Sequence, residues 1–238
     1  MVSRETSGGS PGPPGPPQPL DLPVPSDPPA LPSWLDPAGP GLKRYAEILT
    51  GPGIERGLLG PREAERIWDR HIINCAVVVE PDAGVIGKGA RVADIGSGAG
   101  LPGVVWALAR PDLHVVLIES LLRRATFLTE CVNDLGLTDR VQVIRARAEE
   151  AAERPGSFDV VTARAVAPLA KLATWGAPLL RPGGTLVAVK GESAAEEVSR
   201  DQEILDGLKL NDVEVRQLGR GLVDPPTTVV TAIRSTAE

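Results

Sequence analysis

The chain has 238 residues, 42% of them hydrophobic, and a formal net charge of −6, which suits one α/β domain with a full core. No apolar run approaches about 18 residues, so we expect no membrane span, and the two cysteines without any CxxC, HExxH or histidine cluster predict a reduced, cytoplasmic protein that binds no metal. The acidic balance counts mildly against a nucleic-acid substrate, although basic residues can gather locally.

Residues 1–40 are predicted to be a disordered Pro/Gly-rich tail. They hold 13 of the 24 prolines and too few apolar residues to offset the entropy of ordering. The segment lacks the cationic start and apolar centre of a signal peptide. The folded domain is therefore expected over residues 41–238, with N-terminal helices over 41–88 and the core over 89–238.

Strands and helices are predicted to alternate through this domain. Helices are expected over 41–50 and from 61 towards 79, then strands over 91–95, 114–118, 141–145, 158–162 and 185–189, with helices to 109 and over 121–135, 169–180 and 194–208. The last two strands, over 213–218 and 227–233, are joined by a loop without a helix, so they should pair antiparallel. The fold class is α/β, a Rossmann-like, seven-stranded, mostly parallel sheet with a terminal antiparallel hairpin.

The most informative segment is 91–103, a short apolar strand followed by a glycine-rich turn. Asp94 lies near the end of the strand, and the turn contains Gly96, Gly98 and Gly100. Glycines allow positive φ and let a ligand contact bare backbone. The next strand ends in Glu119, where a carboxylate can accept hydrogen bonds from ribose hydroxyls. These features predict a site for a cofactor that contains adenosine.

Two cofactors compete for this site. A dinucleotide is formally allowed, because Gly98-x-Gly100-x-x-Gly103 satisfies the fingerprint. However, Gly96 already closes the strand and Asp94 precedes it, and this register resembles motif I of class I S-adenosylmethionine-dependent methyltransferases. We therefore expect S-adenosyl-L-methionine, with Asp94, Gly96, Gly98, Gly100 and Glu119 at the cofactor.

The residues around the motif bear on the methyl acceptor. Neither Cys75 nor Cys131 has the proline neighbour typical of cytosine C5 chemistry, and 162–165 lacks the Asn/Asp-Pro-Pro-aromatic loop typical of adenine methylation. A lysine-centred set for a ribose hydroxyl would have to combine Asp159, Lys190 and Glu214, with Lys43 as a fourth member, but Asp159 and Glu214 look like ordinary strand-end residues. Guanine N7 carries a free lone pair and needs no base. A small-molecule or protein methyltransferase, another RNA methyltransferase and a non-enzymatic cofactor sensor or ribosome-assembly protein remain alternatives.

Several motifs together resemble one family over about residues 41–234. They are Arg70-His71-Ile72-Ile73-Asn74-Cys75, the run 94–103 ending in Gly-Leu-Pro-Gly, Glu119-Ser120, Arg124, Phe127-Leu128, Arg164-Ala165 and Lys190-Gly191. They are similar to the bacterial small-subunit ribosomal RNA guanine-N7 methyltransferases, first described as glucose-inhibited division protein B. The Pro-rich extension, of an actinobacterial type, lies outside the family pattern.

The resemblance implies a monomeric, cytoplasmic enzyme that methylates N7 of a guanine in the 530 loop of 16S rRNA, near the decoding centre, either free or within the 30S subunit or an assembly precursor. By position, Gly96 and Leu101 would line the cofactor, Ala148 and Glu149 would flank its adenine, and Arg164 would lie in the pocket and position the substrate. RNA contacts are expected from His71, Arg123, Arg124 and Lys190, although His71 also suits a buried core position and Lys190 a strand end. Asn74-Cys75 replaces the family's common Asp-Ser, which weakens any polar role there.

Overall fold

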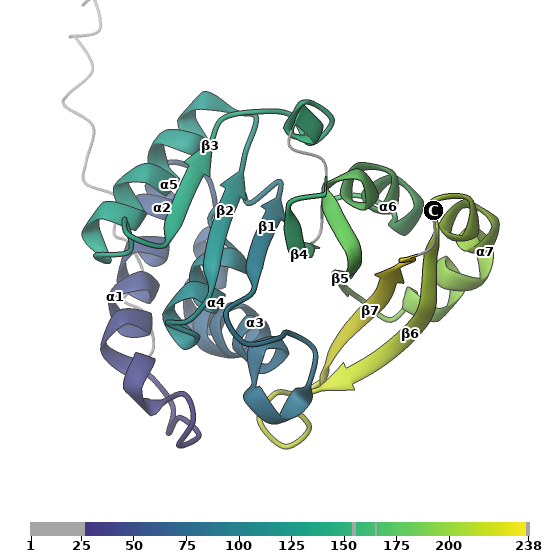
Figure 1. Ribbon diagram of the computed structural model, residues 1–238. Coiled ribbons are helices and arrows are strands. Elements are labelled where there is room, and N and C mark those ends of the chain that lie inside the picture. The colour runs from purple at the N-terminus through teal and green to yellow at the C-terminus, as the bar shows by residue number, and fades with distance from the viewer. Residues whose placement is uncertain (1–26, 154–155, 165, 237–238) are drawn as a thin grey trace, which may run out of the picture.

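A single seven-stranded sheet organises the molecule, and its strand order is β3-β2-β1-β4-β5-β7-β6 (Figure 1). The computed structural model describes residues 27–153, 156–164 and 166–236. The strands are β1 (Arg91–Ile95), β2 (His114–Ile118), β3 (Val141–Ile144), β4 (Phe158–Arg164), β5 (Leu180–Lys190), β6 (Leu210–Leu218) and β7 (Thr227–Arg234).

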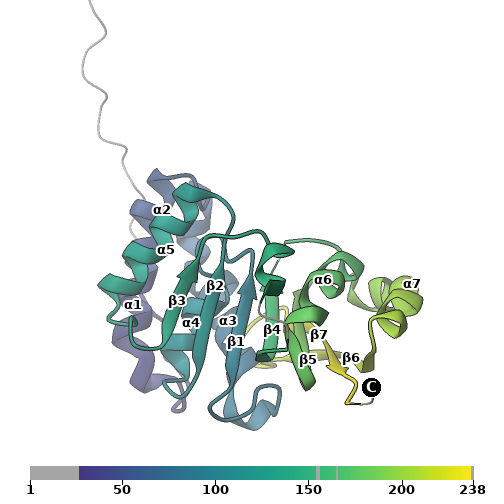
Figure 2. The ribbon, with the colours of Figure 1, turned by 45° about the horizontal axis from the view of Figure 1, so that its top comes forward.

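Strands β1 to β5 run parallel, whereas β7 lies antiparallel between β5 and β6. The predicted fold class is therefore confirmed, terminal hairpin included (Figure 2). Four strands are longer than expected, because β4 continues to Arg164, β5 begins at Leu180, β6 begins at Leu210 and β7 continues to Arg234. The early start of β5 includes a bulge, where the pairing of β4 with β5 shifts between Phe158 and Val160.

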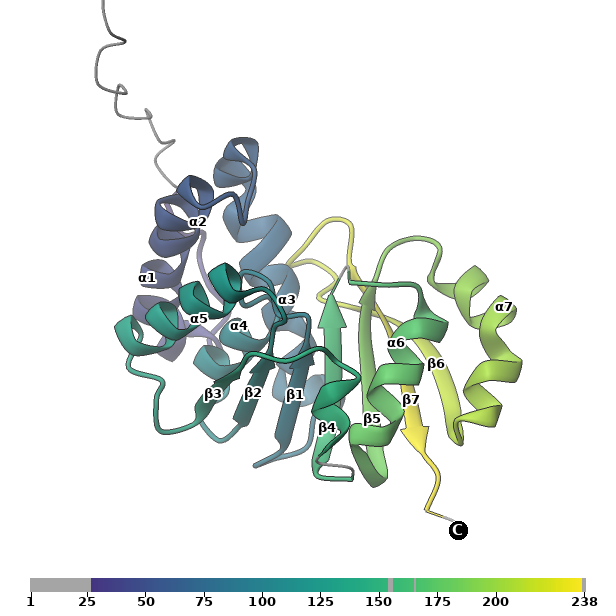
Figure 3. The same cartoon turned by 90° about the horizontal axis from the view of Figure 1, so that it is seen from above.

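Helices cover both faces of the sheet (Figure 3). One core cluster contains alternate strand residues such as Val92 and Val115, and it packs against α1 (Gly39–Thr50), α4 (Gly103–Ala109) and α5 (Leu122–Asp134). The other contains Ala93 and Val116 and packs against α6 (Leu169–Gly176) and α7 (Ala194–Gly207). The period-2 alternation of each strand thus supplies two separate cores.

The segment before β1 is helical but is not the uniform helix expected after residue 61. It consists of short turns: α2 (Pro52–Glu55), η2 (Pro61–Arg66), η3 (Ile67–Ile73), α3 (Asn74–Ala76), η4 (Val77–Val79) and η5 (Pro81–Ala83). The η3 turn is a π-helix. The β-branched residues Ile72, Ile73 and 77–79 lower the preference for a regular α-helix here. Two further turns are η6 (Glu150–Glu153) and η7 (Ala177–Leu179).

The fold begins before residue 41, where sequence alone placed the end of the tail. Leu35 is fully buried in the first core cluster, η1 spans Asp36–Ala38, and α1 already begins at Gly39. Residues 31–40 therefore contribute to the domain, because Leu35 supplies the apolar anchor that composition over the whole segment concealed. Residues 1–26 of the expected tail lie outside the described residues.

Candidate active site

A cavity of about 520 Å³ opens at the carboxyl ends of β1, β2 and β4. After β1 the chain continues into α4 on one face of the sheet, whereas after β4 it continues into α6 on the other. Diverging connections of this kind leave the crevice in which open α/β sheets bind ligands. Seven of the residues predicted from the sequence line it: His71, Gly96, Gly98, Leu101, Glu119, Arg124 and Arg164.

The glycine turn forms one wall of the cavity. The backbone N–H of Gly96 donates to the Ile118 carbonyl at 2.8 Å, which joins the end of β1 to β2. Gly98 has a φ of +58°, and a Cβ there would meet only the Gly96 carbonyl oxygen, at 3.8 Å. Because Gly98 also lines the cavity, a side chain at this position would take up space that is open for a ligand.

Gly100, also predicted at the cofactor, is not among the residues that line the cavity. Its φ is +100°, and a Cβ there would lie 2.6 Å from a methyl carbon of Val104 and 2.8 Å from the Tyr45 hydroxyl. The structure therefore places Gly100 behind the turn, where the backbone packs closely against α1 and α4.

Glu119 faces the cavity from the end of β2 and is almost completely buried. One carboxylate oxygen accepts the Gly98 N–H at 3.0 Å, and the other accepts the Leu121 N–H at 2.9 Å. A carboxylate has about four acceptor positions, so Glu119 retains capacity for the hydroxyls of a ribose.

Asp94 lies beneath the glycine turn and is fully buried. Its Oδ2 accepts the Gly103 N–H at 3.0 Å, while its Oδ1 is buried without a partner among the described residues. Burial raises the pKa of Asp94 to about 7, against the opposing hydrogen bond from Gly103. Asp94 does not line the cavity, so its visible role is to join the turn to the start of α4.

Arg164, at the end of β4, projects its guanidinium into a set of contacts from the N-terminal segment. Its Nη1 donates to Cys75 Sγ at 3.1 Å, and its Nη2 lies 3.2 Å from the Arg70 carbonyl oxygen and 2.7 Å from His71 Nδ1. None of these three partners is acidic. Ala165, quoted with it in the family motif, lies outside the described residues.

The other basic residues differ in whether their side chains are paired within the protein or available to a ligand. Lys190 is paired, because its Nζ donates to Glu197 Oε2 at 2.8 Å and to the Ala167 carbonyl at 2.9 Å, and its side chain is only 9% exposed. Arg123 is exposed and lies in a shallow hollow beside the cavity, together with Arg56. Arg124 lines the cavity itself, and its Nε is buried without a partner in the described part of the chain.

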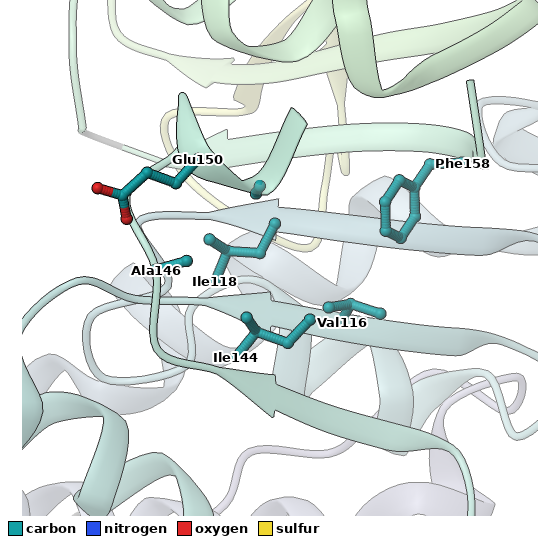
Figure 4. Close-up of a pocket in the computed structure, with 7 residues that line it drawn as sticks. Val116, Ile118, Ile144, Ala146, Glu150 and Phe158 are labelled. Carbon is teal, nitrogen blue, oxygen red and sulfur yellow. The ribbon is translucent and has the colours of Figure 1, made fainter. Parts of the chain in front are cut away.

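Ala148 and Glu149 follow β3 and do not line the 520 Å³ cavity. Ala148 packs in the second core cluster, and Glu149 is exposed. Next to them is a separate cavity of about 330 Å³ against β2, β3 and β4, lined mainly by apolar side chains such as Val116, Ile144 and Phe158 (Figure 4). Its one charged side chain, Glu150, accepts the Arg147 N–H at 3.0 Å.

Sequence reasoning missed several residues of the site. The Tyr45 hydroxyl donates to the Ala99 carbonyl at 2.7 Å, Cys75 and Glu63 take part in the contacts around Arg164, and Val166 covers Gly96. All except Val166 come from the segment before β1. The apolar spacing of Tyr45 and Cys75 indicated burial but gave no signal of a polar contact across the fold.

The residues that line the cavity fit S-adenosylmethionine. The bare backbone at Gly98 leaves room for a ligand, and the Glu119 carboxylate beside it suits ribose hydroxyls. Among the described residues, no group of three or more His, Cys, Asp or Glu side chains is placed to hold a metal ion. In the described part of the chain, no helix is long and apolar enough to cross a membrane.

The antiparallel β7 inserted between β5 and β6, the glycine turn after β1 and the acid at the end of β2 define the class I S-adenosylmethionine-dependent methyltransferase fold. Solved structures agree. A SAM-dependent methyltransferase from Aquifex aeolicus superimposes with a TM-score of 0.52 at 19% identity, covering 74% of this chain and 99% of that one. A geranyl diphosphate methyltransferase gives 0.53 at 15% identity, covering 73% and 80%. These likenesses show the fold alone and leave the acceptor open.

Sequence comparison narrows the class to one family. The family profile GidB, described as rRNA small subunit methyltransferase G, matches residues 40–223. The protein named ribosomal RNA small subunit methyltransferase G in Mycolicibacterium gilvum is 53% identical over 216 residues, covering 90% of this chain and 92% of its own. Its namesake in Salinispora tropica is 55% identical over 195 residues, covering 80% and 79%. The chain therefore belongs to the GidB family of rRNA small subunit methyltransferases.

Proposed function

We propose that this protein transfers a methyl group from S-adenosylmethionine to N7 of a guanine in the 530 loop of 16S rRNA, near the decoding centre. The observation that carries the proposal is the placement of Arg164 in the same cavity as Gly98 and Glu119, in a chain of this family. Part of the cavity lining thus suits the methyl donor, and Arg164 adds a cation that suits the acceptor.

Guanine N7 is an acceptor that demands little chemistry from the protein. S-adenosylmethionine supplies the methyl group as a sulfonium, and the N7 lone pair attacks it without losing a proton. No general base is needed, which agrees with a cavity where both ring nitrogens of His71 are already engaged. The protein contributes by holding donor and acceptor in line.

Arg164 has the donors to hold the acceptor. A guanidinium carries five N–H groups, and the contacts to Cys75, Arg70 and His71 use three of them. The Nε–H and the second Nη1 hydrogen make no hydrogen bond to the described residues. They would bind guanine O6 or a neighbouring phosphate while N7 reacts.

The cofactor and RNA contacts divide among the remaining residues. Gly96, Gly98, Leu101 and Glu119 would hold the cofactor, with Ala148 and Glu149 at its adenine and Asp94 and Gly100 supporting the turn from behind. Arg123 and Arg124 would bind RNA phosphates beside the cavity. Exposed Leu121 and Leu122 at the same rim would contact an unstacked base. His71 and Lys190 are occupied within the protein, so we do not assign them to RNA.

The proposal includes a monomeric enzyme that works in the cytoplasm, where bacterial ribosomes are assembled, on 16S rRNA free or within the 30S subunit or a precursor. The test incubates the protein with labelled S-adenosylmethionine and, separately, naked 16S rRNA, 30S subunits and a cell metabolite extract. We expect label in rRNA, with chain scission at one guanine after borohydride and aniline treatment. Label in a metabolite alone would favour a small-molecule methyltransferase, and methylation at another atom would refute the N7 assignment.

The Arg164→Ala variant completes the test. It should lower the methylation rate at least tenfold, about 1.4 kcal/mol in the transition state, with little change in cofactor affinity. Normal turnover by this variant would overturn the placement of the acceptor.

A further inference from the structure

Three side chains form a hydrogen-bonded chain that leads from the surface of the N-terminal segment into the active-site cavity. Glu63 Oε2, in η2, lies 2.6 Å from His71 Nε2, in η3. His71 Nδ1 lies 2.7 Å from Arg164 Nη2, at the end of β4. The His71 side chain is only 8% exposed, so it lies between its two partners instead of facing solvent.

The identity of the partners fixes the protonation of His71. An ionised carboxylate only accepts hydrogen bonds, so the proton must be on Nε2, facing Glu63. A guanidinium only donates, so Nδ1 must carry the lone pair, facing Arg164. His71 is therefore neutral, in a single tautomer. Burial lowers the pKa of His71, and the charge of Arg164 lowers it further against the opposing effect of Glu63.

The other two contacts of the guanidinium come from the same stretch of chain. Arg70 offers its carbonyl oxygen, and Cys75 offers its sulfur as a neutral thiol, because burial raises the pKa of Cys75. Among the described residues, every hydrogen-bond partner of Arg164 thus lies between residues 70 and 75, whereas the arginine itself belongs to the sheet. His71 is the only one of the three whose acceptor atom depends on a protonation state and on a further residue.

We propose that His71, oriented by Glu63, is a positioning residue that sets the direction of the Arg164 guanidinium towards the methyl acceptor. The lone pair of Nδ1 holds one edge of the guanidinium, and the remaining donors then point in one direction. This inference rests on the proposed function, because it assumes that Arg164 acts in turnover. It replaces the expectation that His71 itself contacts RNA.

Two amide substitutions test the two ring nitrogens of His71 separately. The amide of His71→Asn places an oxygen near the position of Nδ1, so it can still accept from Arg164. The amide of His71→Gln reaches the position of Nε2 and can still donate to Glu63, but it leaves Arg164 without its acceptor. We expect His71→Gln to lower kcat on 30S subunits about tenfold, with an unchanged KM for S-adenosylmethionine, and His71→Asn to remain within about threefold of the parent. His114→Gln, at the exposed start of β2, is the matched control and should behave as the parent.

A double variant tests whether His71 acts through Arg164. If it does, His71→Gln combined with Arg164→Ala should be no slower than Arg164→Ala alone, a fully non-additive cycle. Additive losses, or a His71→Gln enzyme with normal kcat, would overturn the proposal. Failure of the proposed function would instead appear in the parent enzyme, as label in a metabolite alone or at another atom of the RNA, so the two failures are distinguishable.

The pH profile gives a readout that a merely structural role would not move. Protonation of Nδ1 removes the lone pair and places a cation against Arg164, so kcat should fall at acidic pH. The charged groups facing His71 are Glu63 from η2, Arg70 from its own element and Arg164 from β4. His71→Asn should lose this acidic fall in kcat, with folding checked by circular dichroism at each pH. An identical acidic fall in His71→Asn would contradict the assignment.

Discussion

The Tyr45 hydroxyl donates a 2.7 Å hydrogen bond to the Ala99 carbonyl, and this contact ties α1 to the glycine turn. Tyr45 is fully buried, and its hydroxyl lies against the bare face of Gly100. The N-terminal helix therefore holds the shape of a turn that lies about fifty residues further along the chain.

Removing this hydroxyl should weaken the attachment of the turn to α1, while the aromatic ring stays in the core. Tyr45→Phe leaves the Ala99 carbonyl buried and unpaired, at a cost of about 1–3 kcal/mol. We expect a lower melting temperature and S-adenosylmethionine affinity reduced severalfold in calorimetry. Thr50→Val is the control, since it removes a buried hydrogen bond to Ala46 within the same helix. A loss of stability in both variants with unchanged affinity in both would contradict the link to the turn.

The bare backbone at Gly98 should matter for binding more than for folding. Gly98→Ala and Gly84→Ala both place a side chain at positive φ, +58° and +63°, in otherwise open space. The backbone strain should be similar, of order 1–2 kcal/mol. Of these two glycines, Gly98 lines the cavity and Gly84 does not, so Gly98→Ala alone should greatly weaken S-adenosylmethionine binding. Calorimetry on both variants decides the matter, and equal affinities would remove Gly98 from the cofactor site.

Arg123 and Lys190 should separate in the salt dependence of RNA binding. Arg123 is exposed, so Arg123→Ala should reduce the slope of log affinity against log salt by about 0.7, one phosphate contact on single-stranded RNA. Lys190 is paired with Glu197, so Lys190→Ala should lower the melting temperature and leave the slope unchanged. Filter binding of an rRNA fragment over a range of salt measures both slopes, and a smaller slope for Lys190→Ala would restore it to the RNA contacts.

Asp94 should make the folded state less stable as the pH rises towards neutrality. Burial raises the pKa of Asp94 to about 7, whereas an aspartate in an unfolded chain titrates near about 3.9. Between these values the folded state keeps a proton that the unfolded state has released. The free energy of unfolding therefore falls with pH, by at most about 1.4 kcal/mol per pH unit, and becomes level above about pH 7.

Asp94→Asn removes this titration while an amide oxygen can still accept the Gly103 N–H. The melting temperature of the variant should therefore rise relative to that of the parent between pH 5 and 7.5, measured without cofactor. Asp112→Asn is the opposite control, because the hydrogen bond from Arg110 holds the pKa of Asp112 well below its ordinary value. Its removal should reduce stability at neutral pH. Parallel curves for Asp94→Asn and the parent would disprove the raised pKa.

The half of the site carried by the sheet was predictable, and the half carried by the N-terminal segment was not. Gly98, Glu119 and Arg164 follow strand ends, and parallel strands bring their carboxyl ends together whatever the loops do. The contacts of Arg164 with His71 and Cys75 join residues about ninety positions apart through a helical segment of irregular turns. Periodicity shows which face of such a segment is buried, but not which atom it meets.

The expected role of Lys190 and the expected start of the domain differ from the structure for a similar reason, because each depends on packing between distant segments. Lys190 carries the same charge in the sequence whether it binds a phosphate or Glu197, and only the folded position of Glu197, in α7, decides between them. The start of the domain was placed too late, because a single buried Leu35 outweighs the composition of a segment that is otherwise rich in proline.

The residues that hold the Arg164 guanidinium all precede it in the chain. His71 precedes Arg164 by 93 residues, and β4, which carries Arg164, pairs with β1 on the side away from β2. The glycine turn is closed by β1 and β2, whereas the contacts of the guanidinium also need β4 and the N-terminal segment. The two walls of the cavity thus depend on different parts of the chain.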